Sequence, residues 1–352
     1  MKVLKELLGV FAILLTSILL ATPALAGFAG KGELKLTGQL RVGPWVSKSG
    51  IQIAPIYLYS PDYSLGFTSM DEASRNGDLE VTETGTVNEL LFENNSRKPI
   101  LLLAGEVVRG GRQDRMVGTD MILPPGKTRK INVFCVEHGR WTDMGDKGEF
   151  KSPSVMADKA LRQKAEAGGG RAGNQGAVWD EVEKSIDEFK AAAPTQNYRE
   201  IMKTEKFKDG EGIIDRFHDA FANDHAEGMA EGVAGFALAY NGEVQSIEYF
   251  ASPAIFSKYK DKLIRSYVTS ALKNMQESSP VDLDEVKDFI SKSLSKDTHQ
   301  YTTDSEIVIE SRSGSLESYE LLTPKLKSVH YVRYVGASDE ITPKPHPEHF
   351  QE

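Results

Sequence analysis

The stretch VAGFALAYNGEVQSIEYF (Val233–Phe250) carries the strongest fold signal in the chain. Two alternating runs flank the dipeptide Asn241-Gly242, which is the strongest short signal for a two-residue hairpin turn. The stretch therefore predicts an antiparallel β-hairpin that turns at residues 241–242.

Downstream of this hairpin, residues 252–275 predict a long amphipathic helix. Pro253 suits its first turn, where a missing backbone N–H costs little. The side chains expected on its buried face are Phe256, Tyr259, Leu263, Tyr267 and Ala271. A second helix and returning strands are expected before residue 335. Residues 233–335 therefore predict a hairpin-helix-helix-strand unit.

Upstream of the hairpin, residues 33–141 contain short apolar or alternating segments separated by turn signals such as Gly-Pro and Pro-Pro-Gly-Lys. This pattern is typical of an antiparallel sandwich or barrel-like sheet. Residues 152–226 contain three helical segments instead. The whole predicts an α+β fold, with the β-rich sheet packed against a helical middle and the C-terminal unit. We expect one integrated domain over 27–338 and a disordered, proline-rich tail over 339–352.

The first 26 residues, MKVLKELLGVFAILLTSILLATPALA, have the three parts of a secretory signal peptide. Two lysines precede an apolar core, and Ala24-Leu25-Ala26 forms a cleavage site. The core is shorter than the roughly 20 residues of a membrane-spanning helix, although an uncleaved anchor is the alternative. The leader predicts export of a chain that begins at Gly27, into the periplasm or the medium, with no membrane span left after cleavage.

The net charge argues against several classes of partner. The full chain has a formal net charge of -9, which becomes -10 when the leader with its two lysines and one glutamate is removed. An acidic chain binds nucleic acid and anionic lipid poorly. The single cysteine excludes an internal disulfide bond.

No cofactor or metal site is expected from the motifs. Gly168, Gly170 and Gly173 match the spacing of a phosphate-binding loop, but a helix precedes them where a dinucleotide fingerprint needs a strand. His218 and His225 lie seven residues apart in a predicted helix and match no metal motif. We therefore expect a mobile linker at the glycines and no bound metal.

The only cysteine lies in CVEHGRW (Cys135–Trp141), where the nearby histidine suggests a nucleophile. In a strand, successive side chains point to opposite faces, so Cys135 and Glu137 share one face and His138 lies on the other. The carboxylate of Glu137 would raise the thiol pKa. We predict a buried, structural cysteine, with a nucleophilic or redox role as the alternative.

Two polar stretches follow apolar strands: GEVVRGGRQDR (105–115) follows ILLLA, and EHGRW (137–141) follows INVFCV. Binding groups often lie at strand ends. If the two strands are neighbours, Glu106 and Glu137 converge and could act as a general acid and base. The binding candidates are Gln113, Arg115, Arg140, Trp141 and Trp179, in which arginine suits carboxylate or phosphate and tryptophan offers an apolar wall. A structural ion-pair network is the alternative.

Five segments occur in an order that resembles one family. They are residues 87–116, 123–141, 174–182, 235–272 and 328–334. This order is similar to the ARG and Rhodanese-Phosphatase-superfamily-associated protein domain, over roughly 35–335. The resemblance implies little chemistry, because the molecular function of that family is unassigned. Its name suggests a link to ADP-ribose metabolism, which an exported protein would not share.

The resemblance also implies which polar residues matter. The matching positions are Glu106, Gln113, Arg115, Cys135, Glu137, Gly139, Arg140, Trp141, Gln175, Trp179, Ser252, Lys262, Ser266, Tyr267 and His330. From these, Gln175 joins the predicted ligand-binding residues. At position 138 the family more often has glutamine, which weakens any mechanism that needs His138.

Three hypotheses follow. The first is an exported, noncatalytic domain that binds a small anionic or nucleotide-like ligand. The second is a hydrolase acting on an ADP-ribose-like nucleotide or a glycosidic bond through Glu106 and Glu137. The third is a structural envelope protein. The sequence identifies no reaction, ligand or oligomeric state.

Overall fold

The computed structural model describes residues 40–140, 150–152, 154–167, 174–222, 232–273, 275–292, 294 and 297–336. The chain divides into two units, Met1–Gly38 and Gln39–Glu352, and every described residue belongs to the second. The predicted signal peptide, the glycine loop, His225, Trp141 and the C-terminal tail lie outside the described residues.

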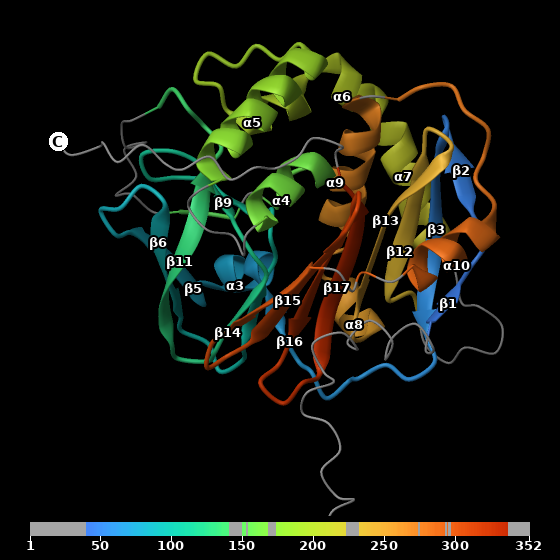
Figure 1. The fold of residues 1–352 in the computed structure, drawn as a ribbon. Coiled ribbons are helices and arrows are strands. Elements are labelled where there is room, and N and C mark those ends of the chain that lie inside the picture. The colour runs from blue at the N-terminus through green and yellow to red at the C-terminus, as the bar shows by residue number, and fades with distance from the viewer. Residues whose placement is uncertain are drawn as a thin grey trace, which may run out of the picture. The chain divides into compact units, whose positions relative to one another are not determined.

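The predicted α+β class is confirmed, and its main element is a nine-stranded antiparallel sheet (Figure 1). The order is β1 (Leu40–Val42), β3 (Ile51–Leu58), β12 (Gly235–Tyr240), β13 (Glu243–Phe250), β17 (Ser328–Val335), β16 (Leu316–Leu322), β15 (Ile307–Ser313) and β14 (Asp297–Thr302), and β2 (Val46–Lys48) also pairs with β3. The sheet thus joins the first strands of the described chain to the last.

The predicted hairpin is present and lies in the middle of this sheet. Asn241 and Gly242 have φ values of 55° and 75°, the left-handed backbone that both central positions of its turn require. Gly235 is essential for the close pairing, because an added Cβ would lie 2.2 Å from the carbonyl oxygen of Glu248. All six residues of β12 are buried, since strands flank it on both sides and helices cover it.

The strand β3, over residues 51–58, belongs to a different sheet from the one expected. The sequence groups them with the β-rich segment 33–141, but β3 pairs with β1, β2 and β12 in the large sheet. All eight β3 residues are buried. A strand that is apolar on both faces needs cover on both sides, and the large sheet provides it.

Two smaller sheets form the sandwich-like part. One has the order β5 (Leu79–Glu83), β6 (Glu89–Asn94), β11 (Thr128–Cys135), β9 (Arg115–Val117) and β8 (Val107–Val108), and the other has β10 (Met121–Leu123), β7 (Ile100–Leu102) and β4 (Thr68–Ser69). They share a second apolar core that contains Leu90 and Ile131 from one sheet and Ile100 and Leu123 from the other. The strands before Glu106 and Glu137 therefore lie in different sheets and are not neighbours.

The helices agree with their local signals. They are α3 (Met70–Asn76), α4 (Lys159–Glu166), α5 (Gln175–Phe189), the 3-10 helix η2 (Tyr198–Lys203), α6 (Glu205–Asp209), α7 (Glu211–Ala222), α8 (Pro253–Phe256), α9 (Lys260–Lys273) and α10 (Leu283–Ser291). Ser69 and Glu72 form a capping box at the start of α3, and Gly77 ends it in the left-handed conformation.

The helix expected over 252–275 is divided into α8 and α9, although all five side chains expected on its buried face are buried. The helix α9 packs against α4, α5, α6 and α7 and against β12. It therefore connects the helical middle of the chain with the large sheet. Among the described residues, no helix has the length and apolar character needed to cross a bilayer.

Candidate functional site

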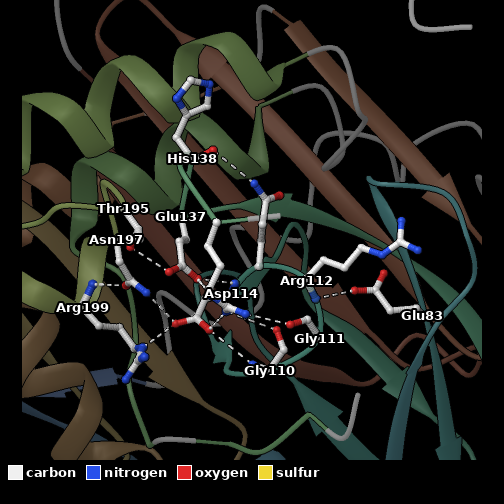
Figure 2. Close-up of polar contacts among 12 residues, drawn as sticks. Glu83, Gly110, Gly111, Arg112, Asp114, Glu137, His138, Thr195, Asn197 and Arg199 are labelled. Carbon is white, nitrogen blue, oxygen red and sulfur yellow. Dashed lines mark hydrogen bonds and ion pairs between the residues drawn. The ribbon is translucent and has the colours of Figure 1, made fainter. Parts of the chain in front are cut away.

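Glu137 lies at the end of β11 in the network of polar contacts that Figure 2 shows, and Arg140 is its ion-pair partner. Arg140 Nε lies 2.9 Å from Glu137 Oε2, and Arg140 Nη2 lies 3.2 Å from Asp114 Oδ1. Thr195 Oγ1 donates to Glu137 Oε1 over 2.8 Å, and Arg199 Nε donates to Asp114 Oδ2 over 2.6 Å. Burial alone would raise the pKa of Glu137, but the hydrogen bonds from Arg140 and Thr195 outweigh it and lower that pKa. The network ties the strand end to the segment around residues 195–199.

Glu106 lies in a different cluster. Its Oε1 is paired with the Lys262 ammonium, and its Oε2 accepts the backbone N–H of Leu103 over 2.7 Å. Lys262 Nζ also lies 3.0 Å from Asp71 Oδ2. Burial raises the pKa of Glu106, and neighbouring Asp71 adds to this while Lys262 opposes it. Glu106 thus shares its cation with Asp71, and no described contact joins it to Glu137.

The side chain of Gln175 makes two hydrogen bonds with the backbone of Cys135. Its Oε1 accepts the Cys135 N–H over 2.8 Å, and its Nε2 donates to the Cys135 carbonyl over 3.0 Å. Cys135 is fully buried, as predicted, and burial raises the pKa of its thiol. The His138 ring contacts Trp179 instead, with 4.5 Å between ring centroids. Both polar atoms of the Gln175 amide therefore have hydrogen-bond partners within the protein.

Gln113, Arg115 and Trp179 retain unused polar atoms. Arg115 is buried and donates from Nε to the Val87 carbonyl over 3.1 Å. Its Nη1, the Oε1 of Gln113 and the Nε1 of Trp179 are buried and have no hydrogen-bond partner in the described structure. Such atoms are rare in proteins, so these three residues keep unsatisfied hydrogen-bonding groups. Of the predicted ligand-binding residues, Arg140 and Gln175 are engaged, and Trp141 is outside the described residues.

A further buried network joins α4, α9 and the large sheet. Arg162 makes two hydrogen bonds to Glu248, of 3.0 and 2.8 Å. His330 Nε2 lies 2.9 Å from Glu248 Oε1, and its Nδ1 pairs with Asp120. The Tyr267 hydroxyl also contacts Glu248. Arg162, Glu248 and Asp120 could not be found from sequence patterns, because their partners lie far away along the chain.

The charges in this network are strongly coupled. Burial would raise the pKa of Glu248, but the charges and hydrogen bonds of Arg162 and His330 together outweigh it and bring that pKa to about 2. Burial would lower the pKa of His330, but Asp120 and Glu248 raise it to about 9. Glu248 and His330 are thus held charged at neutral pH, which fits a role in fixing the fold.

Open pockets of about 690 and 600 Å³ adjoin α3. The basic side chains that line them are Arg75, Arg97, Lys98, Lys258, Lys262 and Arg265. Lys258 is paired with Glu72, and Lys262 with Asp71 and Glu106. The others are exposed, and charges in water bind ions weakly.

A smaller pocket of about 240 Å³ has a different character, because a buried lysine lies in its wall. The charged residues that line it are Lys159, Lys164, Glu181, Lys184, Lys273 and Glu317. Lys159 is only 7% exposed. Its ammonium donates to the Val335 carbonyl over 3.0 Å and lies 3.4 Å from Gln245 Oε1. Burial lowers the pKa of Lys159 to about 8, even though Asp158 and Glu317 act in the opposite direction.

Lys159 differs from the other buried lysines of the described chain. Lys273, in the same wall, lies 2.8 Å from Asp158 and 2.7 Å from Glu181. Lys262 also has two carboxylate partners. No ion pair joins Lys159 to a described carboxylate, and neutral oxygen atoms alone accept its hydrogen bonds. The sequence did not suggest this site, since Lys159 looks like any other lysine in a polar helix.

Comparison with known proteins gives the family. The family model for the ARG and Rhodanese-Phosphatase-superfamily-associated Protein domain matches residues 39–332. Searches of curated proteins and of solved structures found no match. Because the matched residues span most of the chain, this protein belongs to the ARG and Rhodanese-Phosphatase-superfamily-associated protein domain family, whose molecular function is unassigned.

Proposed function

We propose that this protein is an exported domain that binds a small anion in the pocket beside Lys159. The observation that carries the proposal is a buried ammonium group without a carboxylate partner in the described structure. A buried charge is unfavourable unless an opposite charge compensates it. A carboxylate or phosphate group in the pocket would provide that charge.

The composition of the pocket supports an anion of limited size. Four lysines and two glutamates line it, and Asp158, which pairs with Lys273, adds a third carboxylate. The four ammonium groups therefore exceed the three carboxylates by one positive charge. The volume of about 240 Å³ is below the roughly 300–1,000 Å³ of pockets for drug-sized ligands. We therefore expect a ligand smaller than a nucleotide.

The strand-end site around Arg115 is the competing location. It retains three unpartnered polar atoms, but the sequence-predicted residues Arg140 and Gln175 are occupied by contacts within the protein. The hydrolase hypothesis gains no support there, because Glu106 and Glu137 belong to separate networks. If the protein bound no ligand, that result would favour the third hypothesis, a structural role in the cell envelope.

The anion proposal predicts thermal stabilisation by phosphate or by a small dicarboxylate such as malonate. A ligand at 100 times its Kd adds about 2.7 kcal/mol to the free energy of unfolding. We expect Lys159→Met to lose this stabilisation and Arg115→Leu to keep it. Thermal shift and isothermal titration calorimetry of all three proteins measure the effect. Stabilisation that survives in Lys159→Met but disappears in Arg115→Leu would move the site to the strand end, and no stabilisation by any anion would reject the proposal.

Export is proposed from the leader sequence, and it predicts a specific mature end. In a bacterial host with two membranes, we expect the full chain to be recovered from the periplasm or the medium. Its N-terminal sequence should begin at Gly27, because cleavage follows Ala26. The matched control is a chain that starts with a methionine followed by Gly27, which should stay in the cytoplasm. Recovery of the intact leader in the membrane fraction would show an anchor instead.

A further inference from the structure

We infer that Lys159 is a nucleophilic amine that forms an imine with a small aldehyde or 2-oxo acid carrying an acidic group. The inference rests on the proposed function, because the same pocket must admit the acidic group. It adds a covalent step and a carbonyl group to a site so far described only as binding an anion.

The first argument is the freedom of the ammonium group. Imine chemistry needs a lysine that can lose its proton, and a carboxylate partner prevents that loss. Lys262 and Lys273 each have two carboxylate partners. Lys159 has only the Val335 carbonyl and the Gln245 side chain, which accept hydrogen bonds but hold no charge. Of these three buried lysines, Lys159 is the one whose neutral form is not opposed by a direct ion pair.

The second argument is the position of Lys159 and its surroundings. The charged and titratable groups around it are Asp158, Lys164, Glu181, Lys184, Tyr240, Lys273 and Glu317. Burial is the largest influence and lowers the pKa of Lys159 to about 8, against an ordinary value of 10.5. At pH 7 it then has roughly two orders of magnitude more neutral amine than an exposed lysine. Gln245 is held in place by a 3.3 Å hydrogen bond from its Nε2 to the Tyr240 carbonyl, which directs its Oε1 to Lys159.

The third argument is that the pocket offers groups for the remaining steps. Glu317 lines it and is largely buried, and burial raises the pKa of its carboxyl group although Arg312 opposes this. A carboxyl group with a raised pKa retains a proton closer to neutral pH and can act as a general acid. Lys164 and Lys184 line the same pocket and could pair with the acidic group of the ligand.

The reaction balances without an oxidant or reductant. The neutral Nζ attacks the carbonyl carbon, a C–N bond forms, and the carbonyl oxygen takes up the proton that the nitrogen loses. The hydroxyl group of this intermediate then leaves as water with a proton from Glu317. The nitrogen lone pair forms the C=N bond, and the second proton of the nitrogen returns to the Glu317 carboxylate. One water molecule is released for each imine.

Reductive trapping tests the inference on the mature chain. The protein is incubated with pyruvate and sodium cyanoborohydride, and the adduct is measured by intact mass and located by peptide mapping. We expect one adduct, with the mass of the acid less one oxygen atom, at Lys159. Its rate should exceed that of exposed lysines such as Lys208 by at least about tenfold, and should rise with pH with a midpoint near 8. Acetone, a ketone of similar size that lacks the acidic group, should react more slowly.

The variants separate this inference from anion binding. Lys159→Arg keeps the positive charge and removes the nucleophile, so it should abolish the adduct and still bind malonate. Lys208→Arg is the matched control, because Lys208 is exposed and does not line the pocket, and it should keep the adduct. An adduct spread over exposed lysines, or one unchanged in Lys159→Arg, overturns the inference. If malonate binds but no adduct is trapped, the imine is rejected and anion binding stands. If the adduct forms but malonate does not bind, the imine is supported and the proposal that the pocket binds small anions in general is rejected.

Discussion

Replacing Glu248 with glutamine is expected to destabilise the protein by about 3–5 kcal/mol, the usual effect of removing one partner from a buried ion pair. The amide has the same shape but no charge, so Arg162 would remain buried without its counter-charge. Arg162 cannot escape by losing its proton, because Glu248, Tyr334 and Tyr267 raise its pKa well above the ordinary value although burial opposes them. Urea unfolding of the variant and the parent measures the loss.

The matched control for this prediction is Glu243→Gln. Glu243 lies in the same strand, β13, but is exposed. It should change the free energy of unfolding by no more than about 0.5 kcal/mol, as is usual for surface positions. Equal effects of the two substitutions would show that the Arg162–Glu248 pair contributes no more than a surface charge.

The same network predicts the pH range of its contribution. The folded pKa of Glu248 is lowered to about 2, so its stabilisation is present above the unfolded value near 4.5 and is lost as pH falls through about 2. The folded pKa of His330 is raised to about 9, so its stabilisation is full below 6.5 and is lost as pH rises through about 9. Both contributions are complete between about pH 4.5 and 6.5. In Glu248→Gln, the His330 pKa measured by NMR titration should fall.

Replacing Lys262 with methionine is the second substitution with a large expected effect, again about 3–5 kcal/mol. Lys262 is the cation shared by Asp71 and Glu106, and its loss leaves two buried carboxylates close together. One of them can take up a proton, and Glu106 is the better candidate because its pKa is already raised. A raised folded pKa means that stability is present at low pH and is lost as pH rises. Urea unfolding should therefore show a smaller loss at pH 5 than at pH 8.

A double variant and a control complete this test. Glu106→Gln combined with Lys262→Met removes one charge of each sign, so it should recover part of the stability lost in Lys262→Met at pH 8. Lys260→Met lies in the same helix, α9, at a less buried position and should have little effect. A double variant no more stable than Lys262→Met would show that Glu106 is not the carboxylate that Lys262 stabilises.

Much of the secondary structure could be predicted because its signals are local. The Asn241-Gly242 turn, the Ser69 cap and the Gly77 helix end all act within a few residues of themselves. The usual burial of a lone cysteine in an apolar strand correctly predicted a buried Cys135. Strand pairing was harder, since neighbouring apolar runs such as β6 and β7 belong to different sheets.

The sequence alone determined the α+β class, the hairpin at residues 241–242, the buried face of α9 and the family to which the chain belongs. The tertiary structure alone decided that Glu106 pairs with Lys262, 156 residues away, and that Lys159 lies buried without a carboxylate beside it. The reason is physical. Turns and caps depend on backbone conformation and hydrogen bonds between near neighbours, whereas the energy of a charge depends on its burial and on partners that only the folded chain brings together.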